Sequence, residues 1–165
     1  MTSWFGKYRG TVVSNIDPIQ IGRLMVSCPV VLGVNITAWA MPCVPYAGPG
    51  VGMFFLPPIG ADLWLEFEGG DPSMPIWVGG FWTVGTTPAL PGLPTTKIIK
   101  TDGCTIKLDD LPGAGGITIE VMPPVVGVPA SIKLSANGIE ITTGAASVAL
   151  DPVMVKINKN ALEVM

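Results

Sequence analysis

Histidine is absent from this sequence of 165 residues. Because histidine is the commonest general base and the commonest metal ligand, its absence removes the usual route to both catalysis and metal binding. Cysteine is scarce, since Cys28, Cys43 and Cys104 form an odd count without CxxC spacing. That pattern argues against a disulfide framework and against a zinc site. We therefore expect buried, unreactive thiols, no metal site and no cofactor.

Charge is also sparse. Charged residues make up 13% of the chain, about half of a typical share, and the net charge is −3. Residues 24–61 carry no charge, yet prolines and glycines interrupt that stretch throughout, so no apolar helix of about 20 residues fits there. The N-terminal segment MTSWFGKYRG lacks a long apolar run, so no signal peptide is expected. We infer that apolar surface is hidden by other subunits.

Motifs of catalysis are missing too. The sequence contains no GxSxG, HExxH or P-loop pattern, and no GxGxxG after a predicted strand. Glu66 and Glu68 resemble an acid pair, but strand alternation on a solvated face explains them better. We expect that the protein is not an enzyme.

The most informative segment present is a predicted hairpin from Gly60 to Trp82. Its first strand alternates, with Leu63, Leu65 and Phe67 on one face and acidic residues and Trp64 on the other. Residues 69–74 supply turn chemistry, and residues 75–81 form the predicted return strand.

The expected register places Phe67 opposite Ile76 and Leu65 opposite Val78 on the inner face, because this pairing keeps the aliphatic residues on one side. Trp64 and Trp77 are then diagonal neighbours on the outer face. Exposed tryptophans are favoured anchors of protein contacts, so both are interface candidates.

These residues carry a family resemblance. The order GxGxFFxPPxGADLWLEFEGGDPSMPIWVGG, together with the upstream segment YRGTVVSNIDPIQIGRLMVSCP, resembles the N-terminal OB-fold domain of phage baseplate assembly protein V and of VgrG-type spikes in contractile injection systems. The resemblance covers about residues 6–82. It agrees with five or six short predicted strands, in residues 4–13, 22–29, 30–44 and 53–56 and in the hairpin, with residues 45–52 as a loop.

At Trp82 the composition changes, since every aromatic residue lies between Trp4 and Trp82. Residues 83–96, TVGTTPALPGLPTT, have the composition of a linker. Short alternating segments follow, with aliphatic pairs that start at positions 132, 139, 148, 155 and 162 in a degenerate repeat of one strand and one turn. The expected strands are residues 105–108, 117–121, 131–134, 138–141, 147–150, 154–157 and 161–164.

Such strands cannot enclose a core in one copy, whereas three copies around a threefold axis can bury their aliphatic columns. The resemblance implies the same arrangement, a triple-stranded β-helix. We therefore expect an all-β chain, with an OB-fold barrel in residues 1–82, a linker in 83–96 and an intertwined trimeric β-helix or prism in 97–165. A monomeric β-sandwich is the alternative, and the lack of aromatics argues against it.

The resemblance implies a homotrimeric central spike, assembled in the cytoplasm as part of a phage tail or tail-like injection particle. A baseplate hub would hold the barrel end, and the target membrane would be touched only during puncture. Leu162 and Val164 would leave the aliphatic columns open at the far end, where we expect a separate PAAR-like tip protein and further interface contacts.

The alternative function is an OB-fold binding module for single-stranded nucleic acid or oligosaccharide. Nucleic-acid binding requires aromatic platforms in a basic groove. The barrel half has only Lys7, Arg9 and Arg23 as cations, and acidic residues outnumber them. We expect no nucleic-acid partner.

Overall fold

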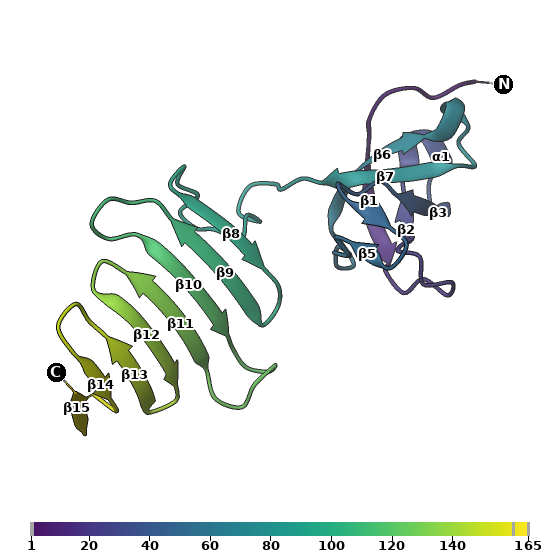
Figure 1. Ribbon diagram of the computed structural model, residues 1–165. Helices are drawn as coiled ribbons and strands as arrows, with labels where there is room; N and C mark the ends of the chain where they lie inside the picture. The colour runs from purple at the N-terminus through teal and green to yellow at the C-terminus, as the bar shows by residue number, and fades with distance from the viewer. Residues whose placement is uncertain (1, 160, 165) are drawn as a thin grey trace. The chain divides into compact units, whose positions relative to one another are not determined.

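The computed structural model describes residues 2–159 and 161–164, except for the side chains of residues 163 and 164. The chain divides into two compact units, Met1–Gly85 and Thr86–Met165. Figure 1 shows a barrel in the first unit and a single antiparallel sheet in the second. The helices among the described residues are all too short to cross a membrane.

The first unit is a closed five-stranded barrel with strand order β1-β2-β3-β7-β6. Its neighbouring strands are antiparallel except for β3 and β7, which are parallel and pair Met41 with Ile76. A five-stranded barrel of this kind is the OB fold, which confirms the expected fold class. The strands are β1 (Tyr8–Ser14), β2 (Leu24–Ser27), β3 (Thr37–Pro42), β6 (Asp62–Phe67) and β7 (Pro75–Gly80).

Two segments between these strands differ from the expectation. A short helix, α1 (Pro29–Leu32), replaces the start of the predicted third strand, because Pro29 has a fixed φ that suits the first turn of a helix. Residues 53–56 were expected to be a strand and are irregular. Instead the preceding loop contains a small hairpin of β4 (Ala47–Gly48) and β5 (Val51–Gly52).

Alternation along the strands builds the barrel core. In β6 the buried residues are Leu63, Leu65 and Phe67, as the sequence predicted. The core also contains residues from every other barrel strand and from the start of α1: Val12, Leu24, Val26, Cys28, Ala40 and Trp77. Cys28 is thus a buried thiol, whereas Cys43 and Cys104 are exposed in the single chain, contrary to the expectation.

Near the turn, the register of the β6–β7 hairpin differs by one residue from the predicted register, while beyond an irregularity between Leu63 and Leu65 the predicted register holds, with Leu63 opposite Gly80. Leu65 lies opposite Trp77 and Phe67 opposite Pro75. Glu68 belongs to the turn and not to the strand, and it begins a short 3₁₀ segment, η1 (Glu68–Gly70). Its backbone N–H donates to the carbonyl of Met74 at 3.0 Å. Gly69 and Gly70 have φ values of 58° and 80°, a left-handed backbone conformation that glycine adopts readily.

This slip reverses the faces of the return strand. The Trp77 side chain is buried in the core, 5% exposed, and its indole Nε1 donates to the carbonyl of Gly22 at 3.1 Å. The predicted outward orientation of Trp77 is therefore wrong. Burying the larger indole, with its N–H hydrogen-bonded, stabilises the barrel more than burying Ile76 and Val78 would. These two side chains are half-buried on the other face of the strand.

The second unit is one eight-stranded antiparallel sheet in the order β15-β14-β13-β12-β11-β10-β9-β8, so that each strand pairs with its neighbour in sequence. All seven expected segments contain strands, and one further strand, β8, begins at the end of the expected linker. The strands are β8 (Thr96–Lys100), β9 (Cys104–Asp109), β10 (Gly116–Val121), β11 (Ala130–Ser135), β12 (Gly138–Thr143), β13 (Ala146–Leu150), β14 (Val155–Ile157) and β15 (Leu162–Val164).

Candidate functional site

The most distinctive surface of the molecule is one face of the C-terminal sheet, which we call the aliphatic face. Strand pairing brings its residues into two columns that cross the strands. The first column contains Ile99, Ile106, Ile119, Ile132, Ile141, Val148, Ile157 and Leu162. The second contains Leu108, Ile117, Leu134, Ile139, Leu150, Val155 and Val164.

The aliphatic face is uncovered in the single chain. Among the column residues that are exposed in strands β8 to β13, the exposed fraction runs from 37% at Val148 to 51% at Ile99. Strand β9 has the reverse of the usual burial pattern, because its aliphatic residues are exposed while the polar residues between them are half-buried. Within the described part of the second unit, no helix and no second sheet packs on this face.

The opposite face of the sheet is polar and partly charged. Lys133 lies directly opposite Glu140, an arrangement of opposite charges that stabilises neighbouring strands. The ammonium of Lys107 lies 3.0 Å from a carboxylate oxygen of Asp109, and that of Lys156 lies 2.9 Å from one of Asp151. The hydrogen bond from Lys156 lowers the pKa of Asp151 to about 2.

This two-sided character determines what the sheet can do. Exposed apolar surface of this extent on one face of a single-layered sheet marks an association site. The polar face, in contrast, is suited to solvent. The geometry therefore supports assembly through the aliphatic face.

The sequence-based interface candidates lie in different places. Leu162 is 54% exposed and pairs with Ile157 at the end of the first column. Val164 pairs with Val155 through its backbone, and its side chain lies outside the described part of the chain. Both therefore belong to the last strand of the sheet, β15.

Trp64 occupies the outer face of the barrel, as expected. The Trp64 side chain is half-buried, and its ring centroid lies 4.7 Å from that of Phe81. The guanidinium carbon of Arg9 lies 5.6 Å from the Trp64 ring centroid. Because Trp77 is in the core, the two tryptophans are not neighbours on one surface. Trp64 alone remains an interface candidate on the barrel.

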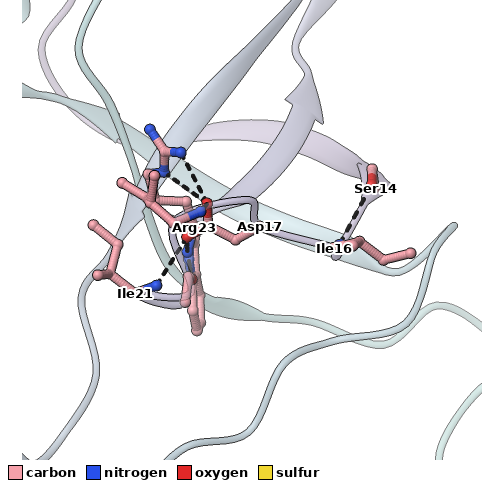
Figure 2. Close-up of polar contacts among 8 residues, drawn as sticks. Ser14, Ile16, Asp17, Ile21 and Arg23 are labelled. Carbon is pink, nitrogen blue, oxygen red and sulfur yellow. Dashed lines mark hydrogen bonds and ion pairs between the residues drawn. The ribbon is translucent and has the colours of Figure 1, made fainter.

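One structural site, centred on Asp17, was not predicted from the sequence. Its carboxylate, 8% exposed, accepts hydrogen bonds from three backbone N–H groups and from the guanidinium of Arg23, some of which Figure 2 shows. The Arg23 hydrogen bond, helped by the backbone N–H groups and opposed by burial, holds the pKa of Asp17 well below its usual range. A single Asp before proline gives no sequence signal for such a network.

Comparison with known protein families agrees with these two units. Residues 8–82 match the family described as the type VI secretion system/phage-baseplate injector OB domain. Residues 96–163 match the family described as the phage baseplate V C-terminal trimerisation domain. The chain belongs to the baseplate V family of spike proteins. No curated protein matches the chain.

Membership of the baseplate V family explains the uncovered surface. The second unit of this spike protein matches a trimerisation domain, so its association surface is expected to meet further copies of the same chain. Neither family description names an enzymatic activity. The baseplate family places the protein in a phage tail-like particle.

Proposed function

We propose that this protein is the homotrimeric central spike of a contractile injection baseplate, connecting a hub to a tip and puncturing the target envelope. The observation that carries the proposal is the aliphatic face, which runs through all eight strands of the second unit without a covering layer. Three such faces turned toward a common axis form a closed prism with the polar faces outside.

Burial at this axis is large enough to hold the prism together. The column side chains of strands β8 to β13 retain about two fifths of their accessible surface in the single chain, and complete burial of such a side chain is worth about 1.5–3 kcal/mol. Summed over the two columns, the association of one chain gains on the order of 10 kcal/mol. This gain is comparable with the entire stability of a small domain.

The proposed role is mechanical and not enzymatic. Sheath contraction would supply the work, and the spike has to resist buckling while it transmits force. Antiparallel strands that pair with their sequence neighbours along the whole unit, closed around an apolar axis, give a stiff shaft with few free strand edges.

Light scattering of the purified protein tests the trimer directly. We expect a mass three times that of the 17.2 kDa chain, and a trimer that resists SDS at room temperature because separation of the closed sheets has a high kinetic barrier. A monomer in dilute buffer would contradict the proposal.

The two ends of the spike would have different partners. We propose that the barrel binds the hub, with Trp64 as a contact, since a half-buried aromatic stacked on Arg9 presents a preformed apolar surface. At the other end β15 has an unpaired edge and Leu162 is exposed, so a PAAR-like tip protein would cover both.

Chemical cross-linking of intact particles followed by mass spectrometry tests these ends. Peptides of the hub should be linked to residues 1–85, and peptides of the tip protein to the last two strands. A particle in which neither partner is linked to its end would refute these assignments, while the trimer proposal would stand on the light-scattering result.

A further inference from the structure

The turns of the C-terminal sheet lie along two opposite edges (Figure 1). We call them the 110 edge, with the turns at residues 110–115, 136–137 and 151–154, and the 122 edge, with the turns at residues 101–103, 122–129 and 144–145. The turns themselves lie outside the two aliphatic columns. In a prism of three sheets they would form the corners.

The 122 edge bears one unusual loop, residues 122–129. Its sequence, MPPVVGVP, carries no charge. Met122, Val125 and Val128 are 45%, 60% and 52% exposed. An uncharged loop with three exposed apolar side chains at the rim of an association face indicates a contact.

The structure holds this loop in a fixed shape. The backbone N–H of Met122 donates to the carbonyl of Gly103 at 2.8 Å, and that of Gly144 donates to the carbonyl of Pro129 at 3.2 Å. Val125 packs so closely on Gly103 that a Cβ there would lie 2.3 Å from its Cγ2 atom. A preformed loop loses little conformational entropy when it docks.

The 110 edge contains a shallow, open hollow between the turn at residues 110–115 and the turn at residues 136–137. Its apolar lining includes Leu111, Ala136 and two residues of the second aliphatic column, Ile117 and Leu134. It also contains Asp109 and Asp110, which form ion pairs with Lys107 and Lys97 of the same chain. Both carboxylates therefore have a lysine partner within their own chain, and the loop at residues 122–129 brings no charge that would compete with these pairs.

Threefold symmetry brings these two features together. Around a threefold axis each contact is heterologous, so the 122 edge of one copy faces the 110 edge of the next. The loop at 122–129 joins β10 to β11, and the hollow lies at the opposite ends of the same two strands, so both features occur at one level of the sheet.

We propose that the loop at residues 122–129 of each chain docks into the hollow on the 110 edge of the neighbouring copy, and so locks the corners of the prism. This inference rests on the trimeric prism proposed above. It adds a specific corner contact that burial of the aliphatic face does not require.

An engineered disulfide tests the docking. Val128→Cys on the loop is combined with Ala136→Cys in the hollow, in a background of Cys43→Ser and Cys104→Ala, while the buried Cys28 is kept. Within one chain these positions lie at opposite ends of strands of six residues, roughly 20 Å apart, so an intrachain disulfide cannot form. Mild oxidation should therefore give a covalent trimer on a denaturing, non-reducing gel.

The matched control pairs Val128→Cys with Val153→Cys, which lies on the same 110 edge but at the turn between β13 and β14. This pair and each single variant should remain uncross-linked. Equal cross-linking of the control, or no cross-link in a protein that light scattering shows to be trimeric, would overturn the docking and leave the spike proposal intact. A monomeric unsubstituted protein would overturn both.

A second pair of variants covers the case in which the cysteines disturb assembly. Val125→Asp places a charge in the docked loop and should accelerate loss of the SDS-resistant trimer about tenfold or more. Val153→Asp, at a position 73% exposed and outside the hollow, should leave that rate unchanged. Equal rates for the two variants would contradict the proposal.

Discussion

At the scale of single residues, Asp17 organises the turn that connects the first two barrel strands, β1 and β2. Its carboxylate oxygens accept from the backbone N–H groups of Ile19, Ile21 and Arg23 at 3.0–3.2 Å, and from the Arg23 guanidinium at 2.8 Å. The guanidinium also lies 5.0 Å from the centroid of the Trp39 ring. One charged side chain therefore fixes the backbone of a whole loop and links it to β3.

Replacement of Asp17 by Asn should destabilise the barrel at neutral pH, because the amide loses the charge that Arg23 pairs with. The folded pKa of Asp17 is depressed, so the stabilisation is present above the unfolded pKa of about 4 and is lost as pH falls toward the folded pKa. Urea unfolding at several pH values, followed by tryptophan fluorescence, measures the difference between the two proteins. It should be largest near pH 7 and shrink below about pH 4.

The matched control is Asp71→Asn. Asp71 accepts hydrogen bonds from the backbone N–H and the hydroxyl of Ser73 in an exposed turn. This variant should change the urea midpoint less than Asp17→Asn does. If the two variants shift the midpoint equally, or if the Asp17 effect persists unchanged at pH 3, the assigned role of Asp17 is wrong.

At the scale of elements, the sequence predicted the strands of the C-terminal sheet well because each has two aliphatic residues at a spacing of two, separated by short turns. Its prediction failed where local pattern and tertiary packing disagree. The one-residue shift of the pairing register in the β6–β7 hairpin depends on the turn at Gly69, which includes Glu68. It also depends on the space that the Trp77 ring fills in the core. Neither is visible in the alternation of either strand.

The same reasoning explains the other misses. Strand β8 has two adjacent isoleucines, Ile98 and Ile99, in place of the alternating aliphatic residues of the later strands, so its pairing with β9 defines it. Helix α1 is a single turn in an apolar segment that is too short to show a helical period. The aliphatic face could be predicted as two residues per strand, but its continuity across the sheet required the register.

Cys104 offers a test of that face. It pairs with Val121 and precedes Ile106 by two residues, so its thiol lies on the aliphatic face and is exposed in the single chain. In the trimer it should be buried, and a thiol reagent should modify it at least tenfold more slowly in native protein than in denaturant. The reaction is followed in a Cys43→Ser variant, in which Cys28 is buried in the barrel core. Fast modification of Cys104 in a native trimer would show that the opposite face of the sheet is the inner one.

At the scale of the whole molecule, the division into two units follows from where bulky side chains occur. The barrel has a core of its own with large residues such as Leu24 and Trp77. The second unit has exposed aliphatic side chains on one face, which other copies cover in the proposed trimer. The first unit is therefore stabilised within one chain, while the stability of the second depends on association.

This difference predicts two unfolding transitions with different physical character. Every tryptophan lies within the first 82 residues, so tryptophan fluorescence follows the barrel alone, while the SDS-resistant trimer band follows the second unit. The barrel transition should not depend on protein concentration, whereas dissociation of the trimer should shift to higher temperature as concentration rises.

A chain ending at Gly85 provides the matched comparison. It should keep the fluorescence transition, because the barrel core lies wholly within residues 1–85, and it should lose the SDS-resistant band, because the aliphatic face is absent. If the shortened chain shows no cooperative fluorescence transition, the barrel requires the trimer in order to fold. In that case the stability of both units would come from association, and the two signals of the full-length chain would change together at one temperature.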